Sequence, residues 1–583
     1  MSFPNLLQVA GLPALLCVGF GAGAGIAHLS LAEAGDVTAQ TPHCRVANLP
    51  ASAQIGEVIK AYEEGDPPLW SDLGSLKYPV TTKSPEAQSY FDQGLRLAAN
   101  FNHAEARRAF RKAQKLDPTC AMCFLGEALV LGPNINAPMD PEANAPAIAA
   151  LRKAQSLADG ASQKEKDLIA AVATRYSEDP ASERPKLDAA FADATAALSD
   201  KYPDDLDLAV LAAEAAMDTQ PWDYWQPGGK EPKGRAADIQ KRLESVLARD
   251  PKHAGAIHLY IHLVEASDRP ERAEAYADRL AALMPGAGHI VHMPSHIYYR
   301  VGRYADSLKS NEDASKVDED YISRTGAAGV YPIGYYSHNV HFVLVSAQLL
   351  GDGKTVLEEA EKLDKWLTNE VVAAIPIAQP VKAAPYFAWA QYGDPDTVLA
   401  MPEPPGAPPY VKAMWHYARG AASAAKKDVA GARKEAEAIH RIAQETDWSV
   451  MDAWAIPARP VLEVAENVVL ARASQAEGND SSAVDLWKRA AETEDTIPYM
   501  EPPYWYYPVR QSLGAALLKT GHPNEAEKEF KAALERSRGS AWALYGLQQA
   551  AKAKGDAAAE SKAAEQLSKA WQGDASFLNL ERL

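Results

Sequence analysis

The chain has 583 residues, 47% of them hydrophobic, which is enough to bury a large core or several stacked ones. Its formal net charge of −18 argues against nucleic acid as a partner, because phosphate binding needs clustered Lys and Arg; it instead favours solubility and cationic ligands such as metal ions. Alanine, leucine, glutamate and lysine are plentiful while long β-branched runs are few, so the composition favours helices.

The first predicted element is an N-terminal targeting segment over residues 1–34. Between residues 6 and 29 no side chain carries a formal charge, and small-residue cleavage sites such as Ala22-Gly23-Ala24 and Ala32-Glu33-Ala34 follow. This pattern predicts a signal peptide, a leader segment over residues 35–86, and export to the periplasm or the extracellular space. Because no Lys or Arg precedes the apolar run, which is almost long enough to span a bilayer, an uncleaved anchor is the alternative. No other contact with a membrane is expected, since no later stretch is long and apolar enough to cross one.

A helical repeat begins at Ala87. Counted from this residue, Gly94 and Ala106 take positions 8 and 20, Phe110 takes position 24 and Pro118 takes position 32. This spacing resembles the tetratricopeptide repeat, a helix-turn-helix unit of about 34 residues. Small residues at positions 8 and 20 let two helices approach closely, and the aromatic ring fills the gap between them. The resemblance implies an all-α solenoid, a right-handed superhelix of such units.

The repeat ends at a pair of cysteines in the sequence Cys120-Ala121-Met122-Cys123. In an oxidising compartment a disulfide is one outcome for this pair, and packed free thiols are a second. A thiolate metal site is the third, although a single CxxC pair is a weak signal for one.

The repeat register divides the chain into four helical regions. It predicts an N-terminal repeat region over 87–200, a central one over 201–350, irregular helical repeats over 351–500 and a C-terminal repeat region over 501–583. In the last region Gly514, Ala526 and Phe530 return to positions 8, 20 and 24. Long loops are predicted where Pro, Gly and aromatic residues concentrate, at 132–138, 220–229, 401–409 and 501–508.

Histidines concentrate in the central region. Eight of the 14 in the chain lie between His253 and His341, where about two would be expected by chance. In two successive repeats, counted from residues 254 and 288, they take positions 5 and 9 both times: His258 and His262, then His292 and His296.

The positions of these histidines predict the helix face on which they lie. At about 100° per residue, positions 5, 9 and 12 of the first helix lie roughly 150° from the face that packs on the partner helix. In tetratricopeptide repeats that face lines the concave groove, so the resemblance implies a groove lined by imidazoles. Glu265 and Tyr299 both take position 12 and share this face.

The paired histidines predict a transition-metal site. Imidazole is a common ligand for zinc, copper and iron, and HxxxH on a helix presents two nitrogens to one ion. A second pair on the next helix allows a mononuclear or a dinuclear site, with His289, His338 and His341 also within reach. Two alternatives remain open: imidazoles that bind peptide carboxylates, and buried structural histidines.

Four further residues bear on this site. Trp222 and Trp225 lie on a loop before the histidine-bearing repeats and are expected either to close over the groove or to anchor the loop. His103 falls in a turn, where packing is favoured over a ligand role. Pro294, between His292 and His296, is expected to kink the helix or to begin it.

Beyond the generic repeat, the chain resembles a widespread group of exported bacterial tetratricopeptide-repeat proteins that has no established activity. The resemblance rests on short motifs spread along the chain: Phe101-Asn102-His103-Ala104-Glu105-Ala106, Cys120-Ala121-Met122, Gly132-Pro133-Asn134, Pro221-Trp222-Asp223-Tyr224-Trp225, HLYIH, HMPSHIY and Ser337-His338-Asn339. It supports the fold and names no substrate.

Three classes of function follow from these features. The first is a repeat protein that binds a peptide, protein or small molecule in its groove, with a His-rich metal site. The second is a metal-dependent hydrolase or oxidoreductase in which Glu265 serves as acid or base. The third is a metal-free scaffold. No Gly-rich phosphate loop, HExxH motif or nucleophile elbow points to another chemistry.

Overall fold

The computed structural model describes residues 62–179 and 181–583. The predicted signal or anchor segment and Cys44 lie outside these residues. Within them, no helix combines the length and apolar character needed to cross a membrane. Regular structure there is helical, and the β-structure consists of the isolated bridges Asn134–Ala137 and Trp225–Pro232. The predicted all-α fold is therefore confirmed.

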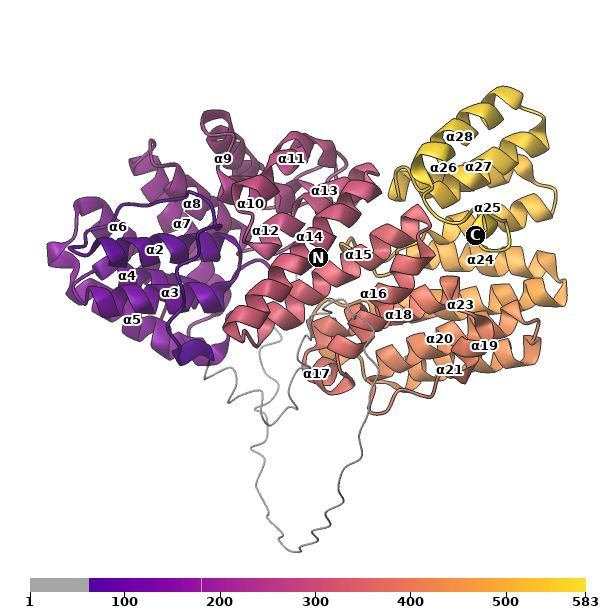
Figure 1. The fold of residues 1–583 in the computed structure, drawn as a ribbon, viewed down its shortest axis with the longest axis horizontal. Helices are drawn as coiled ribbons and strands as arrows, with labels where there is room; N and C mark the ends of the chain where they lie inside the picture. The colour runs from indigo at the N-terminus through magenta and orange to yellow at the C-terminus, as the bar shows by residue number, and fades with distance from the viewer. Residues whose placement is uncertain (1–61, 180) are drawn as a thin grey trace, which may run out of the picture. The chain divides into compact units, whose positions relative to one another are not determined.

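Helices follow one another along the chain as packed pairs (Figure 1). The N-terminal half begins with α2 (Pro85–Ala99), α3 (His103–Leu116), α4 (Ala121–Val130), α5 (Asn144–Ser156), α6 (Gln163–Ala173), α7 (Arg184–Lys201), α8 (Leu206–Met217) and α9 (Ala236–Arg249). It continues with α10 (Ala254–Val264), α11 (Glu274–Leu283), α12 (Gly288–His292), α13 (Pro294–Val301), α14 (Tyr304–Thr325), the π-helix η4 (Tyr331–Tyr336) and α15 (Ser337–Leu350).

The C-terminal half continues the same arrangement. Its helices are α16 (Gly353–Trp366), α17 (Asn369–Ala374), α18 (Gln379–Tyr392), α19 (Pro395–Ala400), α20 (Pro409–Ala425), α21 (Val429–Glu445), α22 (Ser449–Ala453), α23 (Ala458–Glu477), α24 (Asp480–Glu494), α25 (Val509–Lys519), α26 (Pro523–Arg536), α27 (Ala541–Lys554) and α28 (Ala557–Ala570). The four segments predicted as long loops all contain non-helical backbone, and α20 and α25 begin where the proline-rich and aromatic loops end.

The glycine and phenylalanine positions of the repeat pack against one another, as the repeat register predicts. Phe110 is 1% exposed, and a Cβ added at Gly94 or Gly126 would lie 2.6 or 2.4 Å from its ring. In the C-terminal repeats a Cβ added at Gly514 or Gly546 would lie 2.7 or 2.1 Å from the ring of Phe530. The glycines leave room for a phenylalanine between three successive helices, which explains why both residue types recur at one spacing.

This packing makes Gly94 sensitive to added volume. Gly94→Val should destabilise the protein by about 1–3 kcal/mol, because Phe110 is held on both sides and has no room to move. Gly160→Val is the control: no heavy atom lies within 4 Å of its added Cβ, so a change within about 0.5 kcal/mol is expected. Urea unfolding followed by circular dichroism compares the two, and equal stabilities would contradict the packing described here.

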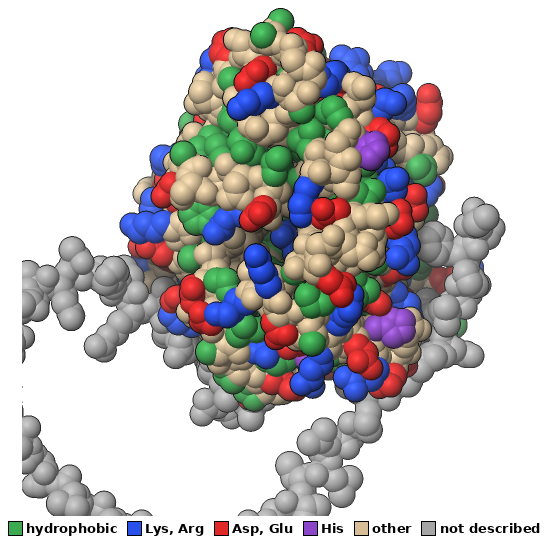
Figure 2. Space-filling view, turned by 90° about the vertical axis from the view of Figure 1, so that its right-hand side faces the viewer, with side chains coloured by type: hydrophobic (Ala, Val, Ile, Leu, Met, Phe, Trp, Pro, Cys, Tyr) green, Lys and Arg blue, Asp and Glu red, His purple; other side chains and the backbone are tan. Residues whose placement is uncertain are grey.

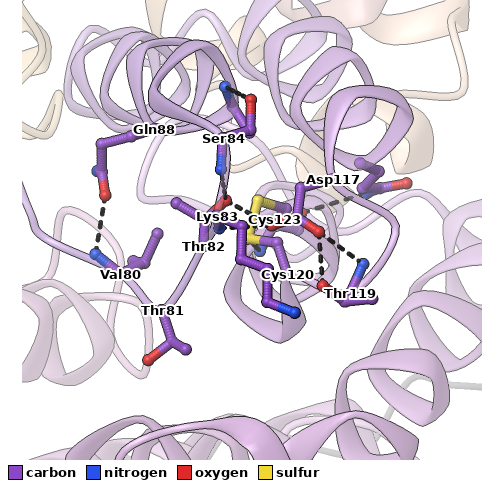
Figure 3. The surroundings of a disulfide bond; sticks show 12 residues. Val80, Thr81, Thr82, Lys83, Ser84, Gln88, Asp117, Thr119, Cys120 and Cys123 are labelled. Atoms are coloured by element: carbon purple, nitrogen blue, oxygen red, sulfur yellow. Dashed lines mark hydrogen bonds between the residues drawn. A yellow bond between two sulfur atoms is a disulfide. The ribbon is translucent and has the colours of Figure 1, made fainter.

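The two cysteines of the CxxC pair form a disulfide (Figure 3). Both side chains are fully buried, and Cys120 caps the N-terminus of α4. The loop beside them is held by Asp117, which accepts hydrogen bonds from Thr82 Oγ1 (2.6 Å) and Thr119 Oγ1 (2.6 Å). Of the three outcomes open for this pair, the structure has the disulfide.

The apolar core forms two large clusters that meet at α13. Ile297 belongs to the cluster that extends back to Tyr62, while Tyr299, two residues later, belongs to the one that extends on to Leu583. The histidine-bearing helices lie at this boundary. On the outside, the face shown in Figure 2 carries positive and negative side chains interspersed with hydrophobic ones, and the histidines visible there are isolated.

Candidate metal centre

Helix α10 carries the first histidine pair. All its residues from Gly255 to Val264 are buried, so its polar side chains face protein rather than solvent. His253 caps its N-terminus through Nδ1, which accepts from the Ala256 amide (3.2 Å). At its other end Arg300 Nε donates to the Glu265 carbonyl oxygen (2.8 Å). His258 and His262 lie one turn apart between these two ends, on the same face of the helix.

The second pair lies on either side of a break in the helix. Helix α12 ends at His292, Met293 joins it to the next helix, and α13 begins at Pro294. Pro294 thus occupies the first position of α13, where its missing amide hydrogen is not needed. The break lets the short helix α12 bring both His289 and His292 to the site.

Six histidines form two groups, which we name triad 1 and triad 2. Within each triad, the ligand nitrogens lie within 4.8 Å of one another. Triad 1 consists of His258, His262 and His289; triad 2 consists of His292, His296 and His338. Two direct contacts show the convergence: His258 Nε2 lies 3.0 Å from His289 Nε2, and His292 Nε2 lies 2.8 Å from His296 Nε2.

Glu265 links the two triads. Its Oε1 accepts from His262 Nδ1 (2.9 Å), and its Oε2 accepts from His296 Nδ1 (2.7 Å). The Tyr499 hydroxyl also donates to Oε2 (3.0 Å). Glu265 is fully buried, and both of its oxygens are engaged. It therefore positions imidazoles, and the acid or base role expected from its place on the helix stays a prediction.

Two further imidazoles are oriented in the same way. His258 Nδ1 lies 2.8 Å from the Ala99 carbonyl oxygen, and His292 Nδ1 contacts Asn311 Oδ1. An oxygen acceptor at Nδ1 places the proton there and leaves the lone pair on Nε2. Nε2 of His262 has no hydrogen-bond partner among the described residues. This is the arrangement by which a ligating histidine is usually held for a metal ion.

The pKa shifts favour the neutral imidazole at five of the six triad histidines, and His296 is the exception. Burial, reinforced by neighbouring imidazoles, lowers the pKa of His258, His289, His292 and His338 well below the usual value. Burial also lowers the pKa of His262. For His296 burial acts in the same direction, but the Glu265 carboxylate outweighs it and raises the pKa. Burial raises the pKa of Glu265, but the imidazoles of His296 and His262 outweigh it and hold the pKa below its usual value. Neutral imidazoles are the form that binds metal ions.

A phenylalanine covers each triad. The ring centroid of Phe101 lies 4.5, 6.1 and 5.6 Å from the three imidazoles of triad 1. Phe342 lies 5.0 Å from each imidazole of triad 2. Phe101 has a φ of 53°, in the left-handed region, which a bulky residue occupies only when its surroundings hold it there. The two rings give each triad an apolar neighbour.

The histidines do not line an open groove. Those of triad 1 are at most 2% exposed, as are His292 and His296. The space that a groove would occupy is filled by the turn between α2 and α3, which carries Phe101, and by the segment around Tyr499. A peptide therefore has no room to reach the histidines at positions 5 and 9, which corrects the groove expected from the repeat.

The predicted groove residues Trp222, Trp225 and Tyr299 differ in their distance from the triads. The ring of Trp222 lies 5.1 Å from that of His262, so it covers triad 1, and it is 39% exposed. Trp225 anchors its loop by donating from Nε1 to the Leu263 carbonyl oxygen (2.6 Å). Tyr299 is buried against Tyr304 and Phe342.

Two predicted histidines lie outside both triads. His341 lies three residues after His338 and so projects from an adjacent face of α15, toward Tyr506 at 5.8 Å between ring centroids. Both of its ring nitrogens lack hydrogen-bond partners among the described residues. His103 begins α3 and lines a cavity of about 160 Å³, together with Arg175 and Glu214. Burial lowers the pKa of His103 to about 4.

Sequence reasoning missed the residues that complete the site. Phe101, Asn311, Phe342 and Tyr499 contact the histidines or Glu265, yet they come from four separate segments. Of these four residues, only Phe101 is marked in the sequence, because it stands in one of the motifs on which the family resemblance rests.

The role of Glu265 can be tested by removing its charge. Glu265→Gln is expected to weaken metal binding by about 10–100-fold, because an amide has one acceptor oxygen and cannot hold both Nδ1–H groups. The control is Glu244→Gln; Glu244 accepts from the Tyr260 hydroxyl (2.9 Å) and has no contact with the triads. Competition against a chelator of known affinity measures both, and an unchanged affinity in Glu265→Gln would rule out the positioning role.

Comparisons with known proteins find distant matches among solved structures. No protein-family profile and no curated protein matches the chain. Among solved structures, human IFIT1 dimer with m7Gppp-AAAA is 11% identical, with 90% of this chain and 95% of that chain covered and a TM-score of 0.32. Yeast Tom70 is 11% identical, with coverages of 84% and 93% and a TM-score of 0.27. The P58(IPK) TPR domain is 13% identical, with coverages of 80% and 98% and a TM-score of 0.21. Similarity at this level has no bearing on what this chain binds.

Proposed function

We propose that this chain is an exported helical-repeat protein that binds transition-metal ions through triads 1 and 2. The observation that carries the proposal is the geometry of the imidazoles, with three ligand nitrogens of each triad within 4.8 Å of one another. Three protein ligands on each ion leave one coordination position open, as in catalytic rather than structural sites.

Buried structural histidines are the rival explanation. A buried polar atom without a hydrogen bond costs about 1–3 kcal/mol, so a structural cluster should pair its nitrogens. His262 Nε2 is unpaired among the described residues although the imidazole is buried. A metal ion bound there removes this cost, and it also explains why four Nδ1 atoms have oxygen acceptors.

Elemental analysis of untagged protein, purified without chelators, tests the proposal. About two transition-metal ions per chain are expected, and chelator-treated protein should take up zinc or copper tightly. His440→Gln is the matched control, because His440 is paired with Glu466 (3.0 Å) away from the triads. If the protein retains no metal and shows no tight uptake, the histidines are better explained as buried structural residues, or the protein as a metal-free scaffold.

The geometry of the site disfavours one form of the metalloenzyme alternative. A hydrolase that uses Glu265 as general base is disfavoured, since both carboxylate oxygens are hydrogen-bonded to other groups. Partner binding elsewhere on the repeat surface remains an expectation from the fold, and fold alone does not specify a partner.

Export is supported by two independent features. One is the uncharged apolar segment between residues 6 and 29, followed by small-residue cleavage sites. The other is the disulfide between Cys120 and Cys123, because such bonds persist mainly in oxidising compartments. Intact mass measurement of protein from the periplasmic fraction tests the proposal; we expect a chain that lacks a segment close to residues 1–34. A full-length chain confined to the cytoplasm would contradict it.

A further inference from the structure

The two triads adjoin so closely that they constitute one site. Between triads, ring centroids lie 5.6 Å apart for His262 and His296 and 5.8 Å apart for His289 and His292. Within triads they lie 4.7 to 5.9 Å apart. Because the spacing is the same across the boundary, ions held by the two triads would be neighbours, as in two-metal sites with separations of about 3.5–4 Å.

We propose that triads 1 and 2 together hold a dinuclear copper centre that binds dioxygen between its two ions. This inference rests on the proposed metal-binding function and adds the number of ions, their identity and their small-molecule ligand.

The donor set favours copper. Each triad offers three imidazole nitrogens, and the carboxylate hydrogen-bonded to them among the described residues, Glu265, uses both oxygens on Nδ1–H groups. Sites for iron or manganese pairs rely on carboxylate ligands, whereas imidazole nitrogen suits copper, which binds such sites most tightly among the divalent first-row metals.

Burial favours the reduced form of copper. Charge is costly to bury without compensation, and among the described residues Glu265 is the carboxylate hydrogen-bonded to the triads. Two Cu(I) ions need half the compensating negative charge of two divalent ions. Three imidazoles for each ion and a largely buried surrounding therefore suit a pair of Cu(I) ions in the resting site.

The space between the ions suits a small neutral ligand. Glu265 spans the triads from the Nδ1 side of His262 and His296, so its carboxylate leaves free the Nε2 side, where the ions would lie. Phe101 and Phe342 place apolar rings against the two triads, which disfavours bulky polar ligands there. Dioxygen is small, uncharged and apolar, and it can accept electrons from both ions.

The two Cu(I) ions supply all the electrons that dioxygen needs when it binds. Each Cu(I) gives one electron and becomes Cu(II), and dioxygen takes up both electrons and becomes a bound peroxide dianion with its O–O single bond intact. No proton, leaving group or further reductant is needed for this step. Two Cu(II) ions bridged by one oxygen ligand couple their unpaired spins, so they give no ordinary Cu(II) signal in electron paramagnetic resonance (EPR).

Copper content and EPR spin count together test the proposal. Chelator-treated protein is loaded with Cu(I) without air, freed of excess copper and then exposed to dioxygen. About two copper ions per chain are expected, almost all without an EPR signal. Unfolding the oxidised protein in guanidinium should restore the Cu(II) signal in full, and a Cu(I)-specific chelator should detect little Cu(I).

A variant of triad 2 separates coupled ions from isolated ones. His338→Gln removes a ligand that is only partly buried, so folding should be preserved. This variant is expected to bind one copper ion per chain, and after oxidation its signal should account for all the copper. His341→Gln is the matched control: it lies one turn away on α15 but outside both triads, and it should behave like the unaltered protein.

Several outcomes would overturn the inference. Two copper ions with a full Cu(II) signal would show isolated sites, and copper that stays Cu(I) in air would show that dioxygen does not react. Tight uptake of zinc without copper would overturn the copper assignment while leaving the proposed function intact. Failure to bind any metal would overturn both proposals.

Discussion

Loading the metal-free protein with metal is expected to raise its free energy of unfolding by about 4 kcal/mol for each ion, when the free ion is present at about 1,000 times its dissociation constant. The folded chain holds six imidazoles of triads 1 and 2 in place, whereas the unfolded chain scatters them over residues 258–338. Since metal then binds the folded state far better than the unfolded one, its binding energy adds to stability. Thermal unfolding of chelated and reloaded protein, followed by circular dichroism, measures the difference.

The same comparison in variants provides the control. His262→Gln with His296→Gln removes one ligand from each triad and should abolish the stabilisation by metal. His416→Gln, in a pair with Glu435 away from the triads (2.6 Å), should retain it. Glutamine is preferable to alanine here, because both triad histidines are at most 2% exposed and alanine would leave cavities. Equal stabilisation in all three proteins would mean that the metal binds elsewhere.

Phe530→Ala and Phe110→Ala should each lower the free energy of unfolding by about 3–5 kcal/mol. Both rings are at most 1% exposed and are enclosed by glycines of neighbouring helices, which cannot fill the cavity left behind. Urea unfolding measures the change. Phe124→Ala is the control, since this ring is only partly buried and packs at the edge of the core. Losses below about 1 kcal/mol for both buried rings would contradict the assigned repeat register.

The repeat architecture was accessible from sequence because its physical cause is local. Gly94 and Phe110 recur as Gly514 and Phe530 at the same spacing, and close helix packing requires this pairing of a missing side chain with a large one. The helical period likewise indicated that His258 and His262 share one face, and the 34-residue repeat brought His292 and His296 beside them.

The composition of the site was only partly accessible, because it depends on contacts between distant segments. The repeat suggested four converging imidazoles on an open groove. The structure instead divides six of them into two triads, since the break at Pro294 redirects His289 and His292 and α15 brings His338. His341 differs from His338 by three residues along one helix, and no period in the sequence indicates which of the two faces the site. Phe101 and Tyr499 fill the groove from outside the repeat, where a repeat pattern carries no information.

The most direct test of the metal centre is anomalous diffraction from crystals of copper-loaded protein, recorded on either side of the copper absorption edge. The proposal predicts two anomalous peaks in each chain, one within about 2.0–2.1 Å of three imidazole nitrogens of triad 1 and the other equally close to those of triad 2. Buried imidazoles without a peak, hydrogen-bonded to one another as His258 is to His289 (3.0 Å), would contradict it and assign the histidines to the structure of the core.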